Sequence, residues 1–377
     1  MVYYLGYYNC EQIATEKRAA SPASMNKMGY VISVLSEISD CKSIVVSPCE
    51  TELNKYVKGS VCALNDRVSI KTFDSVQSNN IFVRCFGHIL TKNQLYFYLM
   101  SNIKADDTLI VYHSLALMKV VKKIKKIKKC NLIIEAEELY SDVKEDNALR
   151  KKEIDYFQIA DKYIVITELL NKEINLNNKP RIISHGTYLN VPKYSDRFSD
   201  GKTHLVYAGS FDPRKGGACS AIGAAEFLDE DYVLHILGNG TKADTELIIQ
   251  KIEQTSLKTK CKIVFDGYKT GREFDSFIQS CHIGLSTQQP EGKYNASSFP
   301  SKILMYMSNG LPVVSIRIPA VDTSDVKDYV YYYDDPSPEN IAEAIRQVPI
   351  NSKYAPSDRL AELHNEFVSN LNSFLEI

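Results

Sequence analysis

The chain has 377 residues, 44% of them hydrophobic and 24% charged, and its 45 basic and 46 acidic residues give a net charge of -1. This composition predicts a globular protein of two domains and excludes a general attraction of the whole chain to nucleic acid. The nine cysteines are an odd number without a CxxC pair, which excludes a disulfide framework and a zinc site and favours a reducing, cytoplasmic location.

The first half of the chain alternates short apolar runs with helical patterns, starting from the first residues. MVYYLGYYNC has no basic segment before an apolar one, so no signal peptide is expected, and no apolar run approaches the roughly 20 residues of a membrane helix. Strands are predicted at 2–5, 43–47, 69–72, 108–112, 131–135, 163–167 and 181–184. The alternation indicates parallel α/β units, which predicts a Rossmann-like domain over residues 1–190.

A polar stretch, NVPKYSDRFSDGKTH, interrupts this pattern and predicts a linker over residues 191–202. A second series of strands follows, in HLVYAG, YVLHILG, CKIVFDG, HIGLST, LPVVSI and VYYYD, and predicts another domain over residues 203–352. A last helix is expected at about 356–375, within a C-terminal segment, 353–377, and the family resemblance described below implies that this segment crosses back to the first domain. The predicted fold class is α/β, with two doubly wound Rossmann-like domains facing a cleft.

Ligands of such sheets bind beyond the carboxyl ends of the strands, so the loops that follow the strands are the places to search for chemistry. After HLVYAG comes SFDPRKGG, in which Lys215 is placed to bind a phosphate beside two glycines, although the spacing is not that of a Walker A loop. After YVLHIL comes GNGTKA, which starts at Gly238 and fits a relaxed dinucleotide fingerprint. An NAD-type oxidoreductase therefore stays open as a lesser alternative.

Two further loops of the second domain carry candidate groups. Tyr268 follows CKIVFDG, where it either stacks on a nucleobase or covers the edge of the core. The loop QQPEGKYNASSFPSK leads into a short helix with Pro300 in its first turn. Lys302 at this positive end opposes the helix dipole, and a diphosphate would give Ser301, Lys302 and the backbone N–H groups a common partner. The alternative is a capped helix with a solvated lysine.

In the first domain, His113 ends the strand TLIVYH, and Glu135, Glu137 and Glu138 follow NLII. A histidine and carboxylates at strand ends are candidates for acceptor binding or proton handling, although each has a structural alternative. His185, in ISHGT, is expected to be structural.

The stretch LALMKVVKKIKKIKKC predicts a basic amphipathic helix, with seven lysines between Lys119 and Lys129. An anionic membrane surface contributes roughly 1 kcal/mol per nearby cation, so this helix could hold the protein at the membrane. The alternative is a solvated basic face. Nucleic acid is not an expected partner, because no aromatic interleaving or known module accompanies the charges.

The segments VYAGSFDPRKGG, HILGNG, IVFDGY and SSFPSKILMYMSNGLPVVS, in that order, resemble glycosyltransferase family 4, of the GT-B fold. SPASMNKMGYVISVLSEI and EAEELYSDV look like members that build bacterial surface polysaccharides. The resemblance implies a retaining transfer of a sugar from a nucleotide diphosphate sugar, without a metal or another cofactor. The implied donor-binding residues are Gly209, Ser210, Arg214, Lys215, Gly238, Tyr268, Asn295, Ser297, Ser298, Pro300, Ser301 and Lys302. His113 and Glu138 are the implied catalytic residues, facing the acceptor or the reacting centre.

The chain departs from the family pattern at three positions. Two glutamates of the family are replaced by Ser297 and Met305, and the arginine of the first phosphate loop is replaced by Ser210, with Arg214 nearby. The leading hypothesis is a cytoplasmic glycosyltransferase at the inner face of the membrane, using a UDP-sugar and a glycan, lipid-linked glycan or protein acceptor. The departures keep open a non-catalytic GT-B subunit that positions a protein partner.

Overall fold

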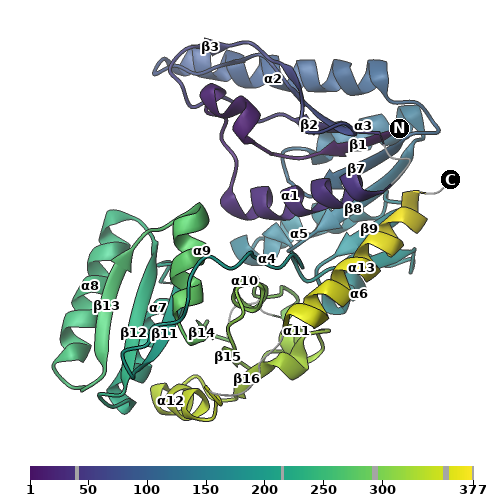
Figure 1. The fold of residues 1–377 in the computed structure, drawn as a ribbon. Helices are drawn as coiled ribbons and strands as arrows, with labels where there is room; N and C mark the ends of the chain where they lie inside the picture. The colour runs from purple at the N-terminus through teal and green to yellow at the C-terminus, as the bar shows by residue number, and fades with distance from the viewer. Residues whose placement is uncertain (39–41, 214–215, 291–295, 351–355, 376–377) are drawn as a thin grey trace. The chain divides into compact units, whose positions relative to one another are not determined.

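The computed structural model describes residues 1–38, 42–213, 216–290, 296–350 and 356–375. Its contacts divide the chain into two compact units (Figure 1). Unit 1 consists of Met1–Thr187 and Asn365–Ile377, and unit 2 of Tyr188–His364. Each unit contains its own, mainly parallel sheet with helices on it, which confirms the predicted α/β class with two Rossmann-like sheets.

Unit 1 is built on an eight-stranded sheet with the order β10-β9-β8-β7-β1-β2-β5-β4, in which β4 runs antiparallel to β5 and the other neighbours are parallel. The strands are β1 (Val2–Leu5), β2 (Ser43–Ser47), β4 (Val61–Ala63), β5 (Val68–Thr72), β7 (Thr108–Tyr112), β8 (Asn131–Ala136), β9 (Lys162–Val165) and β10 (Arg181–Ile183). A separate antiparallel pair is formed by β3 (Tyr56–Val57) and β6 (Ser75–Val76). The central strands are almost wholly buried, as expected of parallel strands covered on both faces.

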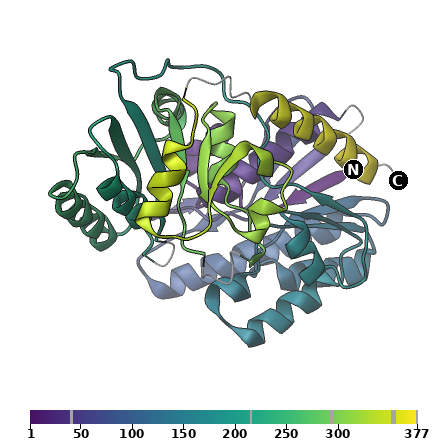
Figure 2. The same cartoon turned by 90° about the horizontal axis from the view of Figure 1, so that it is seen from below.

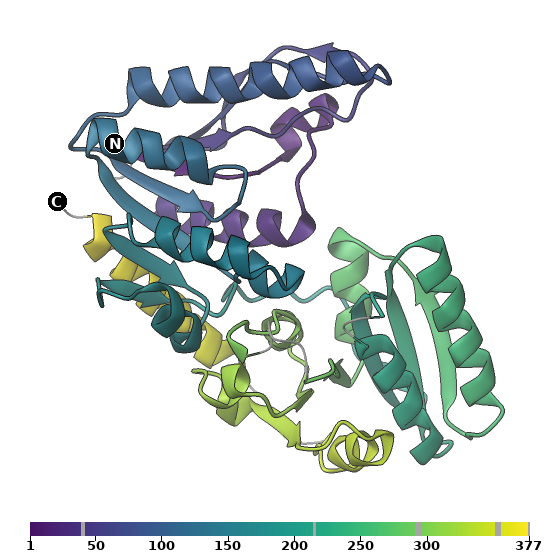
Figure 3. The ribbon, with the colours of Figure 1, turned by 180° about the vertical axis from the view of Figure 1, so that it is seen from behind.

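Helices cover both faces of this sheet. They are η1 (Glu11–Glu16), α1 (Pro22–Glu37), α2 (Ile81–Asn102), α3 (Met118–Lys128), α4 (Tyr140–Lys144), α5 (Asn147–Phe157) and α6 (Glu168–Ile174). The helix α1 lies on one face, and α2, α3 and α5 lie on the opposite one (Figures 1 and 3). The long helix α13 (Pro356–Leu375) begins in unit 2 and ends in unit 1, where Phe367 stacks on Tyr30 of α1 with the ring centroids 5.3 Å apart.

Unit 2 has a six-stranded parallel sheet with the order β13-β12-β11-β14-β15-β16. Its strands are β11 (Thr203–Ser210), β12 (Tyr232–Asn239), β13 (Lys262–Gly267), β14 (Ile283–Ser286), β15 (Val313–Ile316) and β16 (Val330–Tyr333). Its helices are α7 (Gly217–Ala224), η2 (Ala225–Phe227), α8 (Lys242–Ser256), α9 (Gly271–Ser280), α10 (Lys302–Ser308), α11 (Pro319–Asp322), η4 (Lys327–Tyr329) and α12 (Pro338–Arg346). The helix α7 contacts both α8 and α12, and α12 also packs on β16 (Figures 1 and 2).

The segment predicted to be a linker contains neither helix nor strand, but it packs tightly on the sheet of unit 2. The ring of Phe198 stacks on His204 with the centroids 4.1 Å apart, and its N–H donates to the Ser280 carbonyl over 2.8 Å. His204 Nε2 also lies 3.0 Å from a carboxylate oxygen of Asp200. The polar composition of this segment therefore gives no sign that Phe198 anchors it to unit 2.

The strand order of unit 2 reverses between β11 and β14, which pair at only two positions, Leu205 with Ile283 and Val206 with Gly284. Beyond these pairs, the Tyr306 hydroxyl of α10 lies between the strands, accepting from the Ala208 N–H over 2.8 Å and donating to the Leu285 carbonyl over 3.3 Å. Its ring needs a glycine below it, because a Cβ on Gly284 would lie 2.3 Å from the ring. The Tyr306 hydroxyl thus separates β11 from β14 at the carboxyl end of the sheet, which is where α/β folds bind ligands.

Candidate functional site

The helix α10 places the candidate lysine at this parted edge. It begins at Lys302, and Ile303, Leu304 and Met307 are buried as their spacing predicts. It ends at Asn309, after which Gly310 has a φ of +78°, in the left-handed region that favours glycine. The predicted first turn is shifted slightly, because Pro300 precedes the N-cap residue. That residue, Ser301, is exposed and makes no side-chain capping bond.

The Lys302 side chain extends from α10 to the end of β11. Its Nζ donates to the Tyr207 hydroxyl over 3.1 Å and lies 4.4 Å from the centre of that ring. A Cβ on Gly209 would lie 2.3 Å from Lys302 Cε, so the glycine makes room for the lysine. Burial lowers the pKa of Lys302 to about 8. Among the described residues no carboxylate pairs with this ammonium, which leaves it suited to an anion.

The first turn of α7 forms the neighbouring wall. A Cβ on Gly217 would lie 2.8 Å from the Tyr207 hydroxyl, which itself donates to the Ser210 carbonyl over 3.2 Å. The Thr287 hydroxyl, after β14, donates to the Gly217 carbonyl over 2.7 Å. The strand β11, the first turn of α7 and the helix α10 thus meet around Tyr207. We call Tyr207, Gly209, Lys302 and Tyr306 the switch-point cluster.

The sequence predictions for the donor site divide into four groups, the last of which is the pair of strand-end residues Gly238 and Tyr268. The structure brings Gly209, Ser210 and Lys302 together, with Ser301 exposed at the start of the same helix. The residues leading into α10 differ in burial, since Ser297 is buried whereas Ser298 and Pro300 are only partly buried. Three further predicted residues, Arg214, Lys215 and Asn295, lie outside the described residues, and their roles stay predictions.

The strand-end residues Gly238 and Tyr268 have different environments. Gly238 has a φ of +155°, and a Cβ there would lie 1.8 Å from the Gly209 carbonyl oxygen, so the close approach of β11 and β12 by itself requires a glycine. Tyr268, beyond β13, is 59% exposed, so its ring does not cover the core. An exposed ring beyond a strand end is available for stacking on a base.

The GNGTKA loop does not leave a free helix N-terminus for a pyrophosphate. Thr241 and Asp244 form a capping box at the start of α8, and the Asp244 carboxylate accepts from the Thr241 N–H over 3.0 Å. Asp266, the acidic residue at the end of the next strand, lies 2.8 Å from His235 Nδ1. Both acidic groups have structural partners, which weighs against the dinucleotide alternative.

Met305 lies on α10 three residues after Lys302 and is partly exposed. Its thioether sulfur is at most a weak acceptor, so it does not replace a carboxylate as a partner for ribose hydroxyls. The position at which the resemblance implies a ribose contact is therefore apolar.

In unit 1, His113 follows β7 and is only 2% exposed. Its Nε2 lies 2.8 Å from Glu153 Oε1, its Nδ1 is buried without a partner among the described residues, and its ring packs on Phe157 at 4.7 Å. Burial alone would raise the pKa of Glu153, but hydrogen bonds from His113 and Ser141 lower it overall. His113 is thus a fixed interior residue. Its catalytic role and that of the partly buried Glu138 stay predictions.

A buried polar cluster, which we call the Lys27 cluster, lies near the ends of β1, β8 and β10. Lys27 Nζ donates to Ser184 Oγ over 2.8 Å and lies 3.5 Å from Glu137 Oε1. Glu135 accepts from the Tyr4 hydroxyl over 2.5 Å, and burial raises its pKa to about 7. His185 is structural, as expected, with its Nδ1 2.7 Å from the Ile166 carbonyl oxygen.

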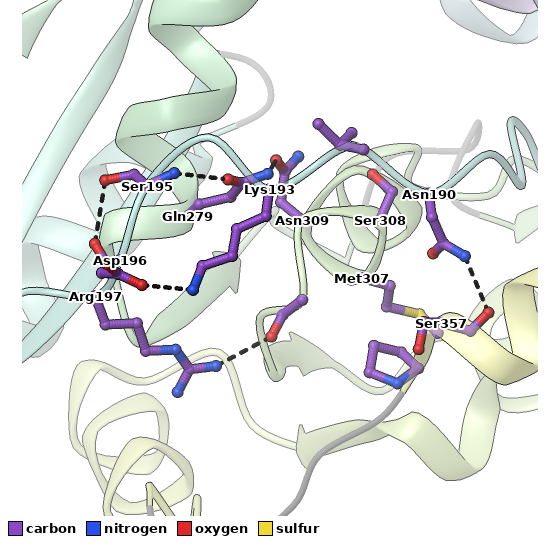
Figure 4. Close-up of a pocket in the computed structure, with 13 residues that line it drawn as sticks. Asn190, Lys193, Ser195, Asp196, Arg197, Gln279, Met307, Ser308, Asn309 and Ser357 are labelled. Carbon is purple, nitrogen blue, oxygen red and sulfur yellow. Dashed lines mark hydrogen bonds and ion pairs between the residues drawn. The ribbon is translucent and has the colours of Figure 1, made fainter.

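A cavity of about 400 Å³ lies at the other end of α10 (Figure 4). It is lined by the start of unit 2 and by the residues that close α10, and Arg197 Nη2 there donates to the Gly310 carbonyl over 3.1 Å. On its opposite wall, Asn190 Nδ2 donates to the Ser357 carbonyl over 3.1 Å. None of the residues predicted to bind the donor lines this cavity.

The sequence reading missed Tyr207, Tyr306 and Lys27. Each lies inside an apolar pattern, where a single polar atom at the end of a large side chain gives no periodic signal. The available signal was the combination of a strand ending in Tyr-Ala-Gly with a helix that offers both a lysine and a tyrosine.

Comparisons with known proteins agree with this reading of unit 2. Residues 202–349, most of unit 2, match the family model described as Glycosyl transferases group 1. No sequence among the curated proteins matches the chain. The match of residues 202–349 confirms the predicted class of enzyme, a glycosyltransferase of EC 2.4.

Solved structures resemble the chain over nearly its whole length. The α,α-trehalose 6-phosphate synthase from Burkholderia multivorans has 11% identity and a TM-score of 0.65, over 99% of this chain and 96% of its own. The trehalose-6-phosphate protein from E. coli bound with UDP-2-fluoro glucose has 10% identity and a TM-score of 0.66, over 99% and 97%. Anabaena HepE, in complex with UDP and glucose, has 11% identity and a TM-score of 0.61, over 99% of both chains. The chain therefore has the two-domain GT-B fold, and its residues 202–349 match a group 1 glycosyltransferase domain.

Proposed function

We propose that the chain is a retaining glycosyltransferase that transfers a sugar from a nucleotide diphosphate sugar, with UDP as the nucleotide, to a glycan, a lipid-linked glycan or a protein. The observation that carries the proposal is the ammonium of Lys302, which has no carboxylate partner among the described residues and lies at the switch point of the region that matches a group 1 glycosyltransferase domain. UDP is favoured because two structures of similar fold hold UDP or a UDP-sugar. Membership of family 4, of the surface-polysaccharide type, belongs to the same proposal.

The chemistry requires a stabilised leaving group, because breaking the bond between the sugar and the diphosphate leaves negative charge on a phosphate oxygen. Lys302 would hold that charge as an ammonium that is already partly withdrawn from water, where ion pairing is stronger than in bulk solvent. The exposed hydroxyl of Ser301, together with Arg214 and Lys215, would complete the diphosphate site, without a metal ion. The acceptor hydroxyl forms the new bond and releases its proton to a base.

On the acceptor side, Glu138 is the candidate to receive that proton, because the resemblance implies this role and its carboxylate is partly buried near the end of β8. The resemblance also implies that His113, whose buried Nδ1 has no partner among the described residues, would face the acceptor or the reacting centre. Both roles rest on the family resemblance together with these placements.

A second candidate function is a non-catalytic subunit that binds and positions an active glycosyltransferase. The apolar side chain of Met305, where the resembled family carries a glutamate, is the observation that favours it. Such a subunit would keep the fold and lose donor turnover.

We also propose a cytoplasmic location at the inner face of the membrane, through the lysines of α3. Met118, Val121 and Ile124 of this helix are buried in unit 1, which leaves the basic face for lipid headgroups. Among the residues that the structure describes, no helix is long and apolar enough to cross a membrane.

The proposed activity is tested with a panel of UDP-, GDP- and NAD-type ligands, measured by thermal stabilisation and by release of nucleotide from nucleotide sugars. We expect UDP to stabilise the protein and a UDP-sugar to be turned over. Stabilisation without turnover of any sugar donor would favour the partner subunit. A shift with NAD alone would contradict both readings.

A further inference from the structure

The helix α2 is apolar on two opposite faces. Its buried face consists of Gly87, Thr91, Leu95 and Leu99, which pack on unit 1. On the other side, the large apolar side chains of Phe82, Phe86, Ile89 and Phe97 are exposed, Phe82 to 82%. These four residues, which we call the α2 ridge, lie three, four or eight residues apart and so share one side of the helix.

The composition of α2 separates this ridge from ordinary surface residues. Single exposed apolar residues are common, but four large apolar residues on one face over four turns, with the exposed Asn93 between Ile89 and Phe97, mark a contact with a partner or a membrane. The 22 residues of α2 contain no aspartate or glutamate. Its N-terminal cap, Asn80, holds the first turn by accepting from the Phe82 N–H over 2.9 Å, so the exposed end is a formed helix.

The basic helix α3 lies beside α2 on the same face of the sheet (Figure 3). The two helices contact each other where Lys123 Nζ lies 5.7 Å from the centre of the Tyr96 ring of α2. Lys125 is engaged inside unit 1, 2.5 Å from a carboxylate oxygen of Asp161. Within the described part of the chain, six further lysines have no carboxylate partner: Lys119, Lys122, Lys123, Lys126, Lys128 and Lys129.

We propose that the α2 ridge and the six unpaired lysines of α3 form one docking surface for an anionic lipid bilayer, with Phe82 and Phe86 entering the acyl-chain boundary. The inference deepens the peripheral-membrane part of the proposed function and rests on it. A bilayer with anionic headgroups offers apolar depth for the ridge and negative charge for the lysines at the same time.

The charges favour this occupant over a second copy of the chain. Two copies that met ridge to ridge across a twofold axis would bring two sets of uncompensated lysines together, and like charges across an interface oppose association.

The chain contains no tryptophan, so a single introduced indole reports on its own position. In Phe86→Trp, we expect the emission to shift to shorter wavelength on phosphatidylcholine vesicles that contain phosphatidylglycerol, and to be quenched by lipids brominated on their acyl chains. Leu257→Trp is the matched control, because Leu257 is an 88% exposed apolar residue of unit 2. Its emission should not change with vesicles. An unquenched Phe86→Trp signal would overturn the proposal.

Two sets of variants separate the apolar and the electrostatic parts of the surface. Serine at Phe82, Phe86 and Ile89 should lower the affinity for these vesicles at least tenfold at any salt concentration. Glutamate at Lys122, Lys126 and Lys129 should lower it most at low salt, because salt screens the charge effect. Unchanged affinity in the serine variant would overturn the proposal. A dimer that forms in the wild-type protein and is lost in the serine variant would also overturn it, by assigning the ridge to a second copy.

Stabilisation by UDP is measured on the same variants. Since the side chains substituted in the serine and glutamate variants are outside unit 2, the stabilisation by UDP should equal that of the wild-type protein. Loss of vesicle binding with intact UDP stabilisation tests the surface alone. If UDP did not stabilise the wild-type protein, the proposed donor site would be contradicted. Vesicle binding would still test the docking surface on its own.

Discussion

Two lysines withdrawn from solvent, Lys27 in unit 1 and Lys302 in unit 2, differ in how many partners they have. Lys27 reaches the Ser184 hydroxyl at 2.8 Å, the carbonyls of Ser184 and Gly186 at 3.1 and 3.3 Å, and the Glu137 carboxylate at 3.5 Å. Within the part of the chain that the structure describes, Lys302 contacts one hydroxyl and one aromatic face. A buried cation with a full set of acceptors belongs to the structure, whereas one with few acceptors is suited to an anionic ligand.

The largest effect that this comparison predicts is on stability. Lys27→Met should destabilise unit 1 by about 3 kcal/mol, because it removes the cation that faces the Glu137 carboxylate and a donor from the buried hydroxyl and carbonyl of Ser184. Urea unfolding followed by circular dichroism measures the change. Lys302→Met in the same assay should change the free energy of unfolding by less than about 1 kcal/mol, because removal of a poorly paired buried cation relieves its desolvation. Equal losses in the free energy of unfolding of the two variants would contradict the distinction between a structural lysine and a ligand-binding one.

The second prediction concerns the ligand. Lys302→Met should weaken binding of UDP by roughly 10- to 100-fold, the value of one charge-assisted hydrogen bond. Isothermal titration calorimetry measures the affinity. Lys260→Met, which alters an exposed lysine of unit 2, serves as the matched control and should bind UDP normally. Normal binding by Lys302→Met would remove this residue from the donor site.

The third prediction follows from the pKa of Lys302, which burial lowers from 10.5 to about 8. In the free protein the ammonium loses its proton as the pH rises through about 8, whereas a bound diphosphate favours the charged form and raises the pKa. The affinity for UDP should therefore fall roughly tenfold between about pH 7 and pH 9. The slope should be absent in Lys302→Met, and a wild-type affinity that is flat over this range would contradict the assignment.

The smallest expected effect lies in the Lys27 cluster. Because burial raises the pKa of Glu135 from 4.5 to about 7, the folded protein binds a proton that the unfolded chain has released between these two values. Stability should therefore fall as the pH rises from about 4.5 to 7. Glu135→Gln, which keeps a hydrogen-bonding partner for Tyr4, should be more stable than wild type above pH 7 and unchanged at pH 4. Thermal unfolding at both pH values checks this, and a gain that did not depend on pH would reject the explanation.

Periodic features of the sequence were sufficient to place much of the fold. The predicted bounds of β1, β2 and β7 are those observed, because each is a short, fully apolar or alternating run between polar turns. The two-residue strands β3 and β6 were not predicted, since two residues carry no period. Phe198 was read as part of a polar linker, because its partners His204 and Ser280 are brought to it only by the folded sheet.

The site was predictable only where one helix or loop carries the signal. Lys302 was found because a cation at a helix N-terminus is locally unfavourable. Tyr207 and Tyr306 were not found, because their hydroxyls acquire a role only when β11, β14 and α10 meet. Lys27 and Ser184 are 157 positions apart in the chain, so no local pattern joins them.

The phenol of Tyr306 also fixes a mechanical relation within unit 2. It bonds to β11 and β14 at once while its backbone belongs to the helix that carries Lys302. The spacing of β11 and β14 and the position of Lys302 are therefore expected to change together. A ligand bound to the ammonium of Lys302 would therefore act on both strands through the Tyr306 ring. How firmly the Tyr306 hydroxyl is held would then set how far the donor site can adjust to the shape of its ligand.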